Sequence, residues 1–259
     1  MQELIEIGLK KVLPGILINQ IAFYSLYKIL KNNECIVDVA YTVSHLVAGS
    51  IYAYHFGLSS FENKFKLGLL ALWTARLAGF LFYYRIMRGF RDPRYDVIFQ
   101  KYKKETLKRD VVVFGQYIFQ GFIVFVTSSS LYFLFKNQLN PFQLAILGTS
   151  IFWIYFEGLA DHQLQQFKDS KNKPQNSICQ DGLWKKSRHP NLFFDLMTWT
   201  TIAIASIKSR HDCLALISPL VLYYVMAGLT VPLTEKLMKK KRGDQFIQYC
   251  SNTNKFLPI

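Results

Sequence analysis

Seven runs of apolar residues alternate with short polar segments along the chain, at residues 12–30, 35–57, 67–87, 111–135, 141–160, 191–207 and 213–232. Most of these runs reach the ~20 residues that a helix needs to cross the hydrocarbon core of a bilayer, although 191–207 is short. Because lipid cannot satisfy backbone polar groups, spans of this kind are expected to be helices. The pattern therefore predicts an all-α, polytopic membrane protein with about seven transmembrane helices in one bundle.

Positive charge is unevenly divided between the two sets of loops. The segments after odd-numbered runs hold 21 Lys and Arg residues, whereas the N-terminus and the segments after even-numbered runs hold 7. Cytoplasmic loops of membrane proteins carry such an excess of Lys and Arg. The bias agrees with seven spans, an N-terminus outside, and a C-terminus on the cytoplasmic or matrix side.

Composition supports one integral-membrane domain over residues 1–259, because the chain is 51% hydrophobic and the seven runs use nearly all of it. The net charge of +14 raises the question of nucleic acid. The cations, however, lie in loops between apolar runs, which favours lipid headgroups, cardiolipin among them, or a phosphorylated cofactor. We therefore expect no nucleic-acid partner. The four cysteines show no paired spacing, so neither a metal site nor a disulfide framework is predicted.

Residues 182–199, GLWKKSRHPNLFFDLMTW, bring cations, a titratable ring and a helix start together. Free N–H groups at a helix N-terminus beside cations favour a phosphorylated ligand. A cluster of cations flanking a membrane helix would also follow from loop charge alone, and we prefer that interpretation for Lys185 and Lys186. Polar residues that enter a membrane span are costly and usually functional. On this ground the candidates are Arg188, His189, Asn191 and Asp195, with Trp199 one turn further along.

Two more polar clusters accompany apolar runs. Arg76 is flanked by apolar residues inside the third run, and Arg94 follows it in RGFRDPRY. In FEGLADHQLQQFK, Glu157 and Asp161 are one helical turn apart, and Lys168 follows seven residues later, so the three share a face. A solvated helix end would explain Lys168, but it explains Glu157 poorly after a wholly apolar stretch.

These clusters, in this order, resemble the membrane reductases of the steroid 5-alpha-reductase superfamily, and the nearest branch is one of domains of unknown function. The matching text is WTARLAGFLFYYRIMRGFRDPRY, FEGLADHQLQQFK, GLWKKSRHPNLFFDLMTW, SPLVLYYVMAGLTVPLTEK and YCSNTNKFLP, which covers about residues 72–259. The resemblance implies a seven-helix bundle that holds NADPH in a polar cavity open to the inner face. A sterol- or enone-like substrate would enter from the lipid side.

The resemblance also implies which residues serve the cofactor, while it assigns no catalytic residue. Arginine forks suit phosphate oxygens, and carboxylates can accept hydrogen bonds from ribose hydroxyls. The hydride chemistry belongs to NADPH itself. The residues expected to bind the cofactor are Arg76, Arg94, Glu157, Asp161, Lys168, Arg188, His189, Asn191, Asp195 and Trp199.

Three positions after His-Pro-Asn depart from the family's Tyr-Phe-Gly-Glu, because this chain has Leu192, Phe194 and Asp195 there. This departure keeps a second function open, namely a catalytically silent subunit of a larger membrane assembly such as a respiratory complex of the mitochondrial inner membrane. A third resemblance, to isoprenylcysteine methyltransferases that share an Arg-His-Pro element, would imply S-adenosylmethionine as donor. The predicted location is the endoplasmic reticulum or the mitochondrial inner membrane.

Overall fold

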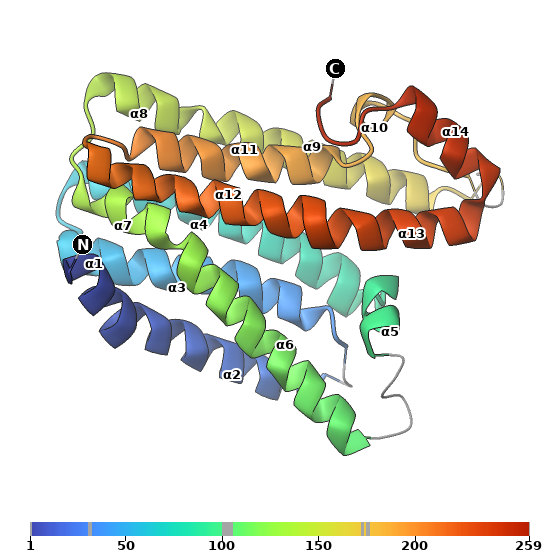
Figure 1. The fold of residues 1–259 in the computed structure, drawn as a ribbon, viewed down its shortest axis with the longest axis horizontal. Coiled ribbons are helices and arrows are strands. Elements are labelled where there is room, and N and C mark those ends of the chain that lie inside the picture. The colour runs from blue at the N-terminus through green and yellow to red at the C-terminus, as the bar shows by residue number, and fades with distance from the viewer. Residues whose placement is uncertain (1, 31–32, 100–105, 172–173, 175–176, 259) are drawn as a thin grey trace.

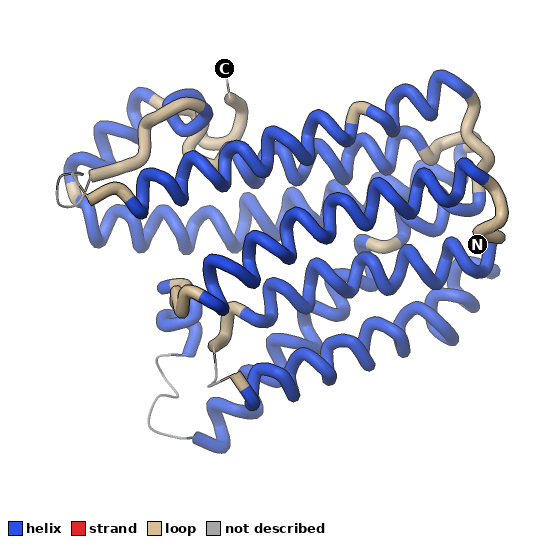
Figure 2. Tube along the Cα trace, turned by 180° about the vertical axis from the view of Figure 1, so that it is seen from behind, coloured by secondary structure: helices blue, strands red, loops and turns tan. Residues whose placement is uncertain are grey.

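The computed structural model describes residues 2–30, 33–99, 106–171, 174 and 177–258. Regular structure in these residues is helical, without a β-strand, and one isolated parallel bridge pairs Ser187 with Asn254 (Figures 1 and 2). Three π-helical stretches (η1, η2, η5) and one 3₁₀ stretch (η4) interrupt the α-helices. The elements are α1 Gln2–Ile7, η1 Gly8–Val12, α2 Leu13–Ile29, α3 Ile36–Phe56, α4 Phe61–Leu81, η2 Phe82–Met87, α5 Pro93–Phe99, α6 Thr106–Thr127, α7 Ser129–Lys136, α8 Pro141–Gly148, α9 Ser150–Asp169, α10 Leu183–Lys186, α11 Pro190–Ala205, η4 Arg210–Leu216, α12 Ile217–Tyr224, η5 Val225–Thr230, α13 Val231–Arg242 and α14 Asp244–Asn252.

Local sequence sets several helix ends. At the start of α4 the Ser60 hydroxyl accepts the backbone N–H of Asn63 at 3.1 Å. At the start of α8, Asn140 and Gln143 exchange side-chain and backbone hydrogen bonds as a capping box. Gly243 separates α13 from α14 with φ of 54°, a left-handed conformation that glycine adopts without penalty.

Six helical stretches are long and apolar enough to cross a membrane, namely Gln2–Ile29, Ile36–Phe56, Phe61–Met87, Leu107–Lys136, Pro141–Asp169 and Arg210–Arg242. They confirm the predicted all-α polytopic class, and the chain is an integral membrane protein. The run predicted as the sixth span forms α11, whose 16 residues extend only ~24 Å at 1.5 Å per residue. This is shorter than a hydrocarbon core of ~30 Å. The described residues thus supply six full-length spans, with α11 as a shorter helix in the bundle.

The helices run roughly along one long axis, and the two chain termini lie toward opposite ends of it (Figure 1). We call the end at which α1 and α8 begin the N-terminal end. The opposite end, where α5, α10 and α14 lie, is the C-terminal end. Helix α11 packs against α9 and α12 and also contacts α7 and α8. These neighbours come from the second half of the chain, and the hydrogen bond between Asp195 and Trp73 adds α4 from the first half.

The largest apolar core surrounds two tryptophans, Trp73 of α4 and Trp199 of α11, which are 1% and 0% exposed. A second core, around Tyr27 and Tyr117, holds α2, α3 and α6 together toward the C-terminal end. Large apolar side chains elsewhere face outward, as expected for helices whose outer surface meets lipid. The central core is the wall against which the polar residues of α4, α9 and α11 are placed.

Candidate functional site

Arg76 of α4 is the centre of a buried polar cluster that joins α4, α9 and α11. Its guanidinium pairs with Glu157 of α9 and, at 2.8 Å from Nη1 to Oδ2, with Asp161 one turn further along. The Asn191 amide of α11 donates to the other oxygen of Asp161 at 3.0 Å. Glu157 and Asp161 are both buried. Because an unpaired charge inside a membrane protein is costly, these contacts hold the three helices in register.

Asp195, one turn along α11 from Asn191, accepts a hydrogen bond from the indole N–H of Trp73 at 3.0 Å. Trp73 lies one turn before Arg76 on the same face of α4. Polar contacts therefore join α4 to α11 at two neighbouring turns, directly through Trp73 and Asp195 and, one turn further, through Asp161 between Arg76 and Asn191. The Trp199 ring packs edge to face on Trp73 with centroids 5.1 Å apart. The His45 ring of α3 contacts both indoles, at 5.6 Å from Trp73 and 4.6 Å from Trp199. A polar face and an aromatic wall therefore meet at this point.

We refer to these residues together as the interior cluster. Its members are Arg76, Glu157, Asp161, Asn191 and Asp195, with Trp73, Trp199 and His45 as the aromatic wall.

The interior cluster has more acceptors than positive charge. The guanidinium of Arg76 pairs with two carboxyl groups, those of Glu157 and Asp161, and the third carboxyl group, that of Asp195, accepts from the Trp73 indole instead. One buried N–H group, Arg76 Nε, has no hydrogen-bond partner among the described residues, whereas the Trp199 indole N–H faces the Asp195 carboxylate. Buried donors without acceptors are costly. The arrangement suits a neutral ligand group that both donates and accepts, such as an amide or a sugar hydroxyl, and it does not suit a phosphate.

Arg94 belongs to a second polar group, at the C-terminal end. Its guanidinium grips the Asp92 carboxylate, with Nη2 at 2.7 Å from Oδ2 and Nε at 3.0 Å from Oδ1. Arg85 of η2 pairs with Asp38 of α3 and lies 3.6 Å from Asp92. The Tyr95 hydroxyl donates to Asp38 at 2.6 Å. We call these five residues the Asp92 clamp, because they fasten α5 to α3 and to the end of η2.

The clamp is paired internally. Burial alone would raise the pKa of Asp92, but the hydrogen bonds and charge of Arg94, together with the charge of Arg85, outweigh burial and hold this pKa at about 2. Burial, and after it the charge of Asp38, raises the pKa of the Tyr95 hydroxyl well above its ordinary value. Arg94 would have to release Asp92 before it could bind a phosphate.

Arg188 and His189 precede α11 but turn away from the interior cluster toward α13. Arg188 Nε and His189 Nε2 lie 2.9 and 3.1 Å from the same oxygen of Glu235. The guanidinium also donates to the backbone oxygens of Thr253, at 2.6 Å, and Cys250, at 3.2 Å. A carboxylate from the chain itself therefore sits where the sequence predicted an anionic ligand, and the C-terminal tail is tied to the same arginine.

Lys168 is not a member of the interior cluster and lies close to Arg85 and Asp92 of the Asp92 clamp. It is exposed near the end of α9, and its ammonium lies 5.1 Å from the centroid of the Phe90 ring. An exposed cation–π contact of this kind is worth about 0.5–1 kcal/mol. The shared face expected for Glu157, Asp161 and Lys168 thus extends from the buried ion pairs to the surface at the C-terminal end.

Six of the ten predicted residues meet in the interior cluster, and the other four do not. The six are Arg76, Glu157, Asp161, Asn191, Asp195 and Trp199, and the four are Arg94, Lys168, Arg188 and His189. The second set shares one location, since all four lie at the C-terminal end of the bundle. The predicted site residues are therefore divided between the interior cluster and the C-terminal end of the bundle.

Seven residues of these groups were not predicted as site residues, namely Trp73, His45, Asp38, Arg85, Asp92, Tyr95 and Glu235. Trp73 was detectable, because it lies three residues before Arg76 and hence on the same helical face. His45 and Asp38 were visible as polar residues within an apolar run, but nothing in the pattern showed what they would contact. Glu235 is an acid directly before a basic stretch, and its contact with Arg188 depends on how the tail folds back.

Phe194, where the resemblance expects glycine, is 5% exposed and turned toward α9. Its ring stacks on Trp153 with centroids 6.1 Å apart and packs on Phe156 at 5.4 Å. The extra ring thus occupies the α9–α11 interface rather than the lipid-facing surface.

Comparison with known proteins adds a family and no characterised relative. A family model described as "Protein of unknown function (DUF1295)" matches residues 23–253. No curated protein and no solved structure matches the chain at a significant level. The matched range contains the interior cluster, the Asp92 clamp and Glu235.

Proposed function

The chain belongs to the DUF1295 family of proteins of unknown function, and we propose that it is an NADPH-dependent membrane reductase of the steroid 5-alpha-reductase type. Its substrate would be a lipid-soluble, sterol- or enone-like molecule. One observation carries the proposal: six residues chosen for their resemblance to reductase cofactor sites converge from three helices onto the interior cluster. Charged and amide groups are rarely kept inside a membrane bundle without a task.

The chemistry of the interior cluster fits the uncharged end of the cofactor. Nicotinamide carries an amide, and its ribose carries hydroxyls, so both need acceptors and donors in close proximity. Glu157, Asp161 and Asp195 supply acceptors, while Arg76 Nε is a donor that lacks a partner among the described residues. When bound, NADPH would supply a hydride to the β-carbon of an enone, and a proton at the α-carbon would complete the saturated ketone. The side chains named here would bind the nicotinamide and its ribose and orient them.

The phosphate groups fit less directly. Arg94 and Arg188 are the forked cations that the resemblance assigns to phosphates, and each is bonded to a carboxylate of this chain. Binding of a dinucleotide would therefore require an exchange of partners, in which phosphate replaces Asp92 or Glu235. Because both carboxylates lie at the C-terminal end, the phosphates would lie there and the nicotinamide nearer the interior cluster.

The proposal is tested by nucleotide binding to the purified full-length protein in lipid nanodiscs. Trp73 and Trp199 are internal fluorophores, so saturable quenching by NADPH reports binding beside them. Asp195→Ala should weaken NADPH by about 10-fold or more, the effect of losing a hydrogen bond to a charged group. Asp244→Asn, in an exposed position on α14, is the control. A wild-type protein that shows no saturable quenching overturns the cofactor assignment. Binding without oxidation of NADPH when a steroid enone is added overturns the reductase.

A second function, a catalytically silent subunit of a larger membrane assembly, is favoured by the internal pairing of Arg94 and Arg188. A protein that no longer binds NADPH would retain these pairs as structure. The mitochondrial inner membrane, with a respiratory complex as partner, is then the candidate location, whereas the endoplasmic reticulum suits the reductase. Native electrophoresis in mild detergent separates the two functions. A small particle that binds NADPH supports the enzyme, and comigration in a large complex without nucleotide binding supports the subunit.

Anionic lipid headgroups, cardiolipin included, are proposed partners of the C-terminal end in either case. Four lysines of α13 are exposed there: Lys236, Lys239, Lys240 and Lys241. Each basic residue near an anionic surface contributes about 1 kcal/mol to membrane attraction. This placement also agrees with a C-terminus on the cytoplasmic or matrix side.

A further inference from the structure

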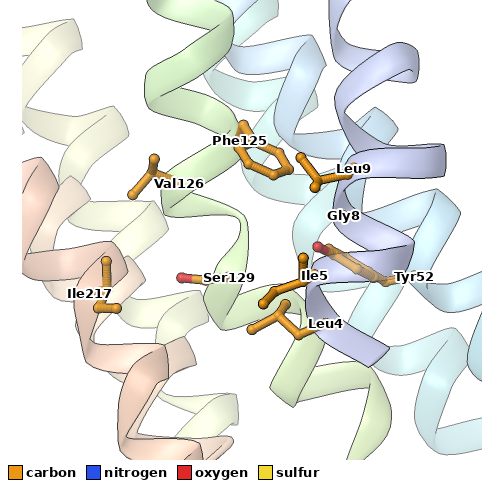
Figure 3. Close-up of a pocket in the computed structure, with 9 residues that line it drawn as sticks. All are labelled: Leu4, Ile5, Gly8, Leu9, Tyr52, Phe125, Val126, Ser129 and Ile217. Carbon is orange, nitrogen blue, oxygen red and sulfur yellow. The ribbon is translucent and has the colours of Figure 1, made fainter. Parts of the chain in front are cut away.

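A half-open apolar cleft of about 270 Å³ lies near the N-terminal end, remote from the residues considered so far. Figure 3 shows its walls: Leu4 and Leu9 come from the first helix, Phe125 and Val126 from α6, and Ile217 from α12. The first helix, the continuous stretch Gln2–Ile29, is π-helical over η1, Gly8–Val12. A Cβ added at Gly8 would meet the Phe125 ring at 3.3 Å. The cleft is therefore closed at this point by direct approach of backbone to ring.

Ser129 and Tyr52 bring hydroxyl groups to the cleft, and Ser129 is the one without a partner among the described residues. It is the third of four successive hydroxyl residues at the junction of α6 and α7, and its neighbours all donate to backbone oxygens one turn back. Thr127 donates to Ile123 at 3.0 Å, Ser128 to Phe125 at 2.8 Å and Ser130 to Thr127 at 3.3 Å. Ser129 Oγ is buried and has no partner among the described residues.

An unpaired hydroxyl inside a membrane protein requires an explanation. Leaving a buried donor without an acceptor costs about 1–3 kcal/mol, and no bulk water reaches the hydrocarbon region to satisfy it. Ser129 could instead donate to a backbone carbonyl of its own helix, because its three hydroxyl neighbours each do so. In Figure 3 the Ser129 oxygen points toward Ile217 of α12, on one side of the cleft. The hydroxyl is placed to meet a group that enters the cleft.

Two lysines lie on the same helices: Lys136 is further toward the N-terminal end than Ser129, and Lys11 follows Leu9 by two residues. Lys136 follows Ser129 by two helical turns, ~10 Å along the axis, and lies 3.6 Å from Glu3. Lys11 lies 3.5 Å from the His55 ring, which is itself 3.8 Å from Glu3. Lys136 and His55 thus share Glu3, while Lys11 contacts His55 and Lys10 pairs with Glu6, so three lysines accompany two carboxylates in this group. A phosphate is complementary to that surplus of positive charge.

We propose that this cleft binds one phospholipid. An acyl chain fills the apolar part, its ester carbonyl accepts a hydrogen bond from Ser129, and its phosphate lies beside Lys136 and Lys11. The volume is slightly below the ~300–1,000 Å³ of typical small-molecule sites, so it suits a single flexible chain better than a fused ring system. The site is independent of the proposed reductase activity, since it shares no residue with the interior cluster or the Asp92 clamp.

Photolabelling tests the proposal on the full-length protein in nanodiscs of phosphatidylcholine. The probe is a phosphatidylglycerol whose acyl chain carries a diazirine, and labelled residues are mapped by mass spectrometry. We expect label concentrated on residues 4–9 and 125–129. Ser129→Ala should lower this labelling about 5-fold to 10-fold, the effect of one lost hydrogen bond. Ser130→Ala is the matched control, because that neighbour is buried and already bonded to its own helix, and it should leave the labelling unchanged.

Two further measurements check the occupant. Ser129→Phe should fill the cleft and abolish the label, whereas Ile151→Phe, on the exposed face of α9, should not. A diacylglycerol probe without the phosphate should label the cleft several-fold less than the phospholipid. Equal labelling in wild type and Ser129→Ala overturns the site. Labelling spread over all lipid-facing helices, or a photoactivatable sterol that labels residues 4–9 and 125–129 better than the phospholipid, also overturns it.

Discussion

Arg76 is the residue on which the interior cluster depends. It is the one cation bonded there to the two carboxylates of α9, and the Trp73–Asp195 contact lies one turn away along α4 and α11. Removing one partner of a buried ion pair leaves an uncompensated charge, which costs more than the intact pair contributes. The cluster is therefore both a candidate binding site and a fastening between helices.

Arg76→Met should lower the free energy of unfolding by about 3–5 kcal/mol, because Glu157 and Asp161 would remain buried without a cation. Thermal unfolding in detergent micelles measures the change. Arg88→Met is the control, since Arg88 pairs with Asp169 at 2.8 Å on an exposed surface, where ion pairs contribute little. Equal changes in the two variants would show that Glu157 and Asp161 do not need Arg76.

Glu235 determines whether Arg188 and His189 are available to an anion. Glu235→Gln removes the negative charge that both residues contact. We expect NADPH affinity to rise about 10-fold, the lower end of the effect of a hydrogen bond to a charged group. Titration of nucleotide into the nanodisc-bound protein measures it. Glu62→Gln is the control, because Glu62 pairs with Lys66 on α4, at 2.5 Å. Unchanged or weaker binding in Glu235→Gln would mean that the pair is only structural.

At the scale of elements, the short helix α11 explains why the predicted site is divided. Its 16 residues begin at Pro190, so Arg188 and His189 precede the helix and lie in an irregular segment. The C-terminal tail covers this segment: the Asn254 carbonyl accepts the Arg188 N–H at 2.8 Å, and the Phe256 carbonyl accepts from the Ser187 hydroxyl at 2.7 Å. The positions of the residues before the helix are therefore set by contacts with the C-terminal tail. The positions of the residues after Pro190 are set by packing within the helix bundle.

The Asp92 clamp ties elements together in a way that depends on pH. The folded-state pKa of Asp92, about 2, lies below the ordinary value of 3.8. Its contribution to stability is therefore complete above pH 3.8 and is lost as pH falls to about 2. A shift of this size corresponds to about 2 kcal/mol.

Asp92→Asn should reduce stability at pH 7 and flatten the acid dependence between pH ~4 and ~2. Unfolding midpoints measured across this range would show both effects. Asp244→Asn, in an exposed position on α14, should retain the wild-type dependence. An Asp92→Asn protein that loses stability on acidification as steeply as wild type would remove Asp92 as the cause.

For the whole molecule, the two reactive cysteines that best report topology lie at opposite ends. Cys213, in η4 at the N-terminal end, is exposed, and Cys250, in α14 at the C-terminal end, is half-buried. Cys179 is buried and is a poor probe. Burial raises the pKa of the Cys250 thiol, so it should react more slowly than Cys213.

An impermeant maleimide applied to sealed vesicles should label Cys213 from one face and Cys250 from the other. The loop-charge bias predicts that Cys250 is on the cytoplasmic or matrix face. Cys213→Ser and Cys250→Ser each leave one site and identify the labelled residue by mass. Labelling of both cysteines from the same face would contradict the single membrane pass of Arg210–Arg242 that separates them.

Much of this architecture was decided by the sequence alone. Apolar runs of about 20 residues leave the backbone no alternative to helices in lipid, so the all-α class and the approximate helix bounds follow from the pattern. Helical spacing likewise placed Glu157 with Asp161, and Asn191 with Asp195, each on one face. These conclusions need only local periodicity, which a single helix carries within itself.

Only the tertiary structure decided which polar residues meet. The pairing of Arg76 with Glu157, of Trp73 with Asp195 and of Arg188 with Glu235 joins positions 81, 122 and 47 residues apart. Such contacts depend on how helices are rotated and how the tail folds back, and local spacing contains neither. The unpaired hydroxyl of Ser129 is of the same kind. In sequence it is one of four similar residues, and packing alone separates it from the other three.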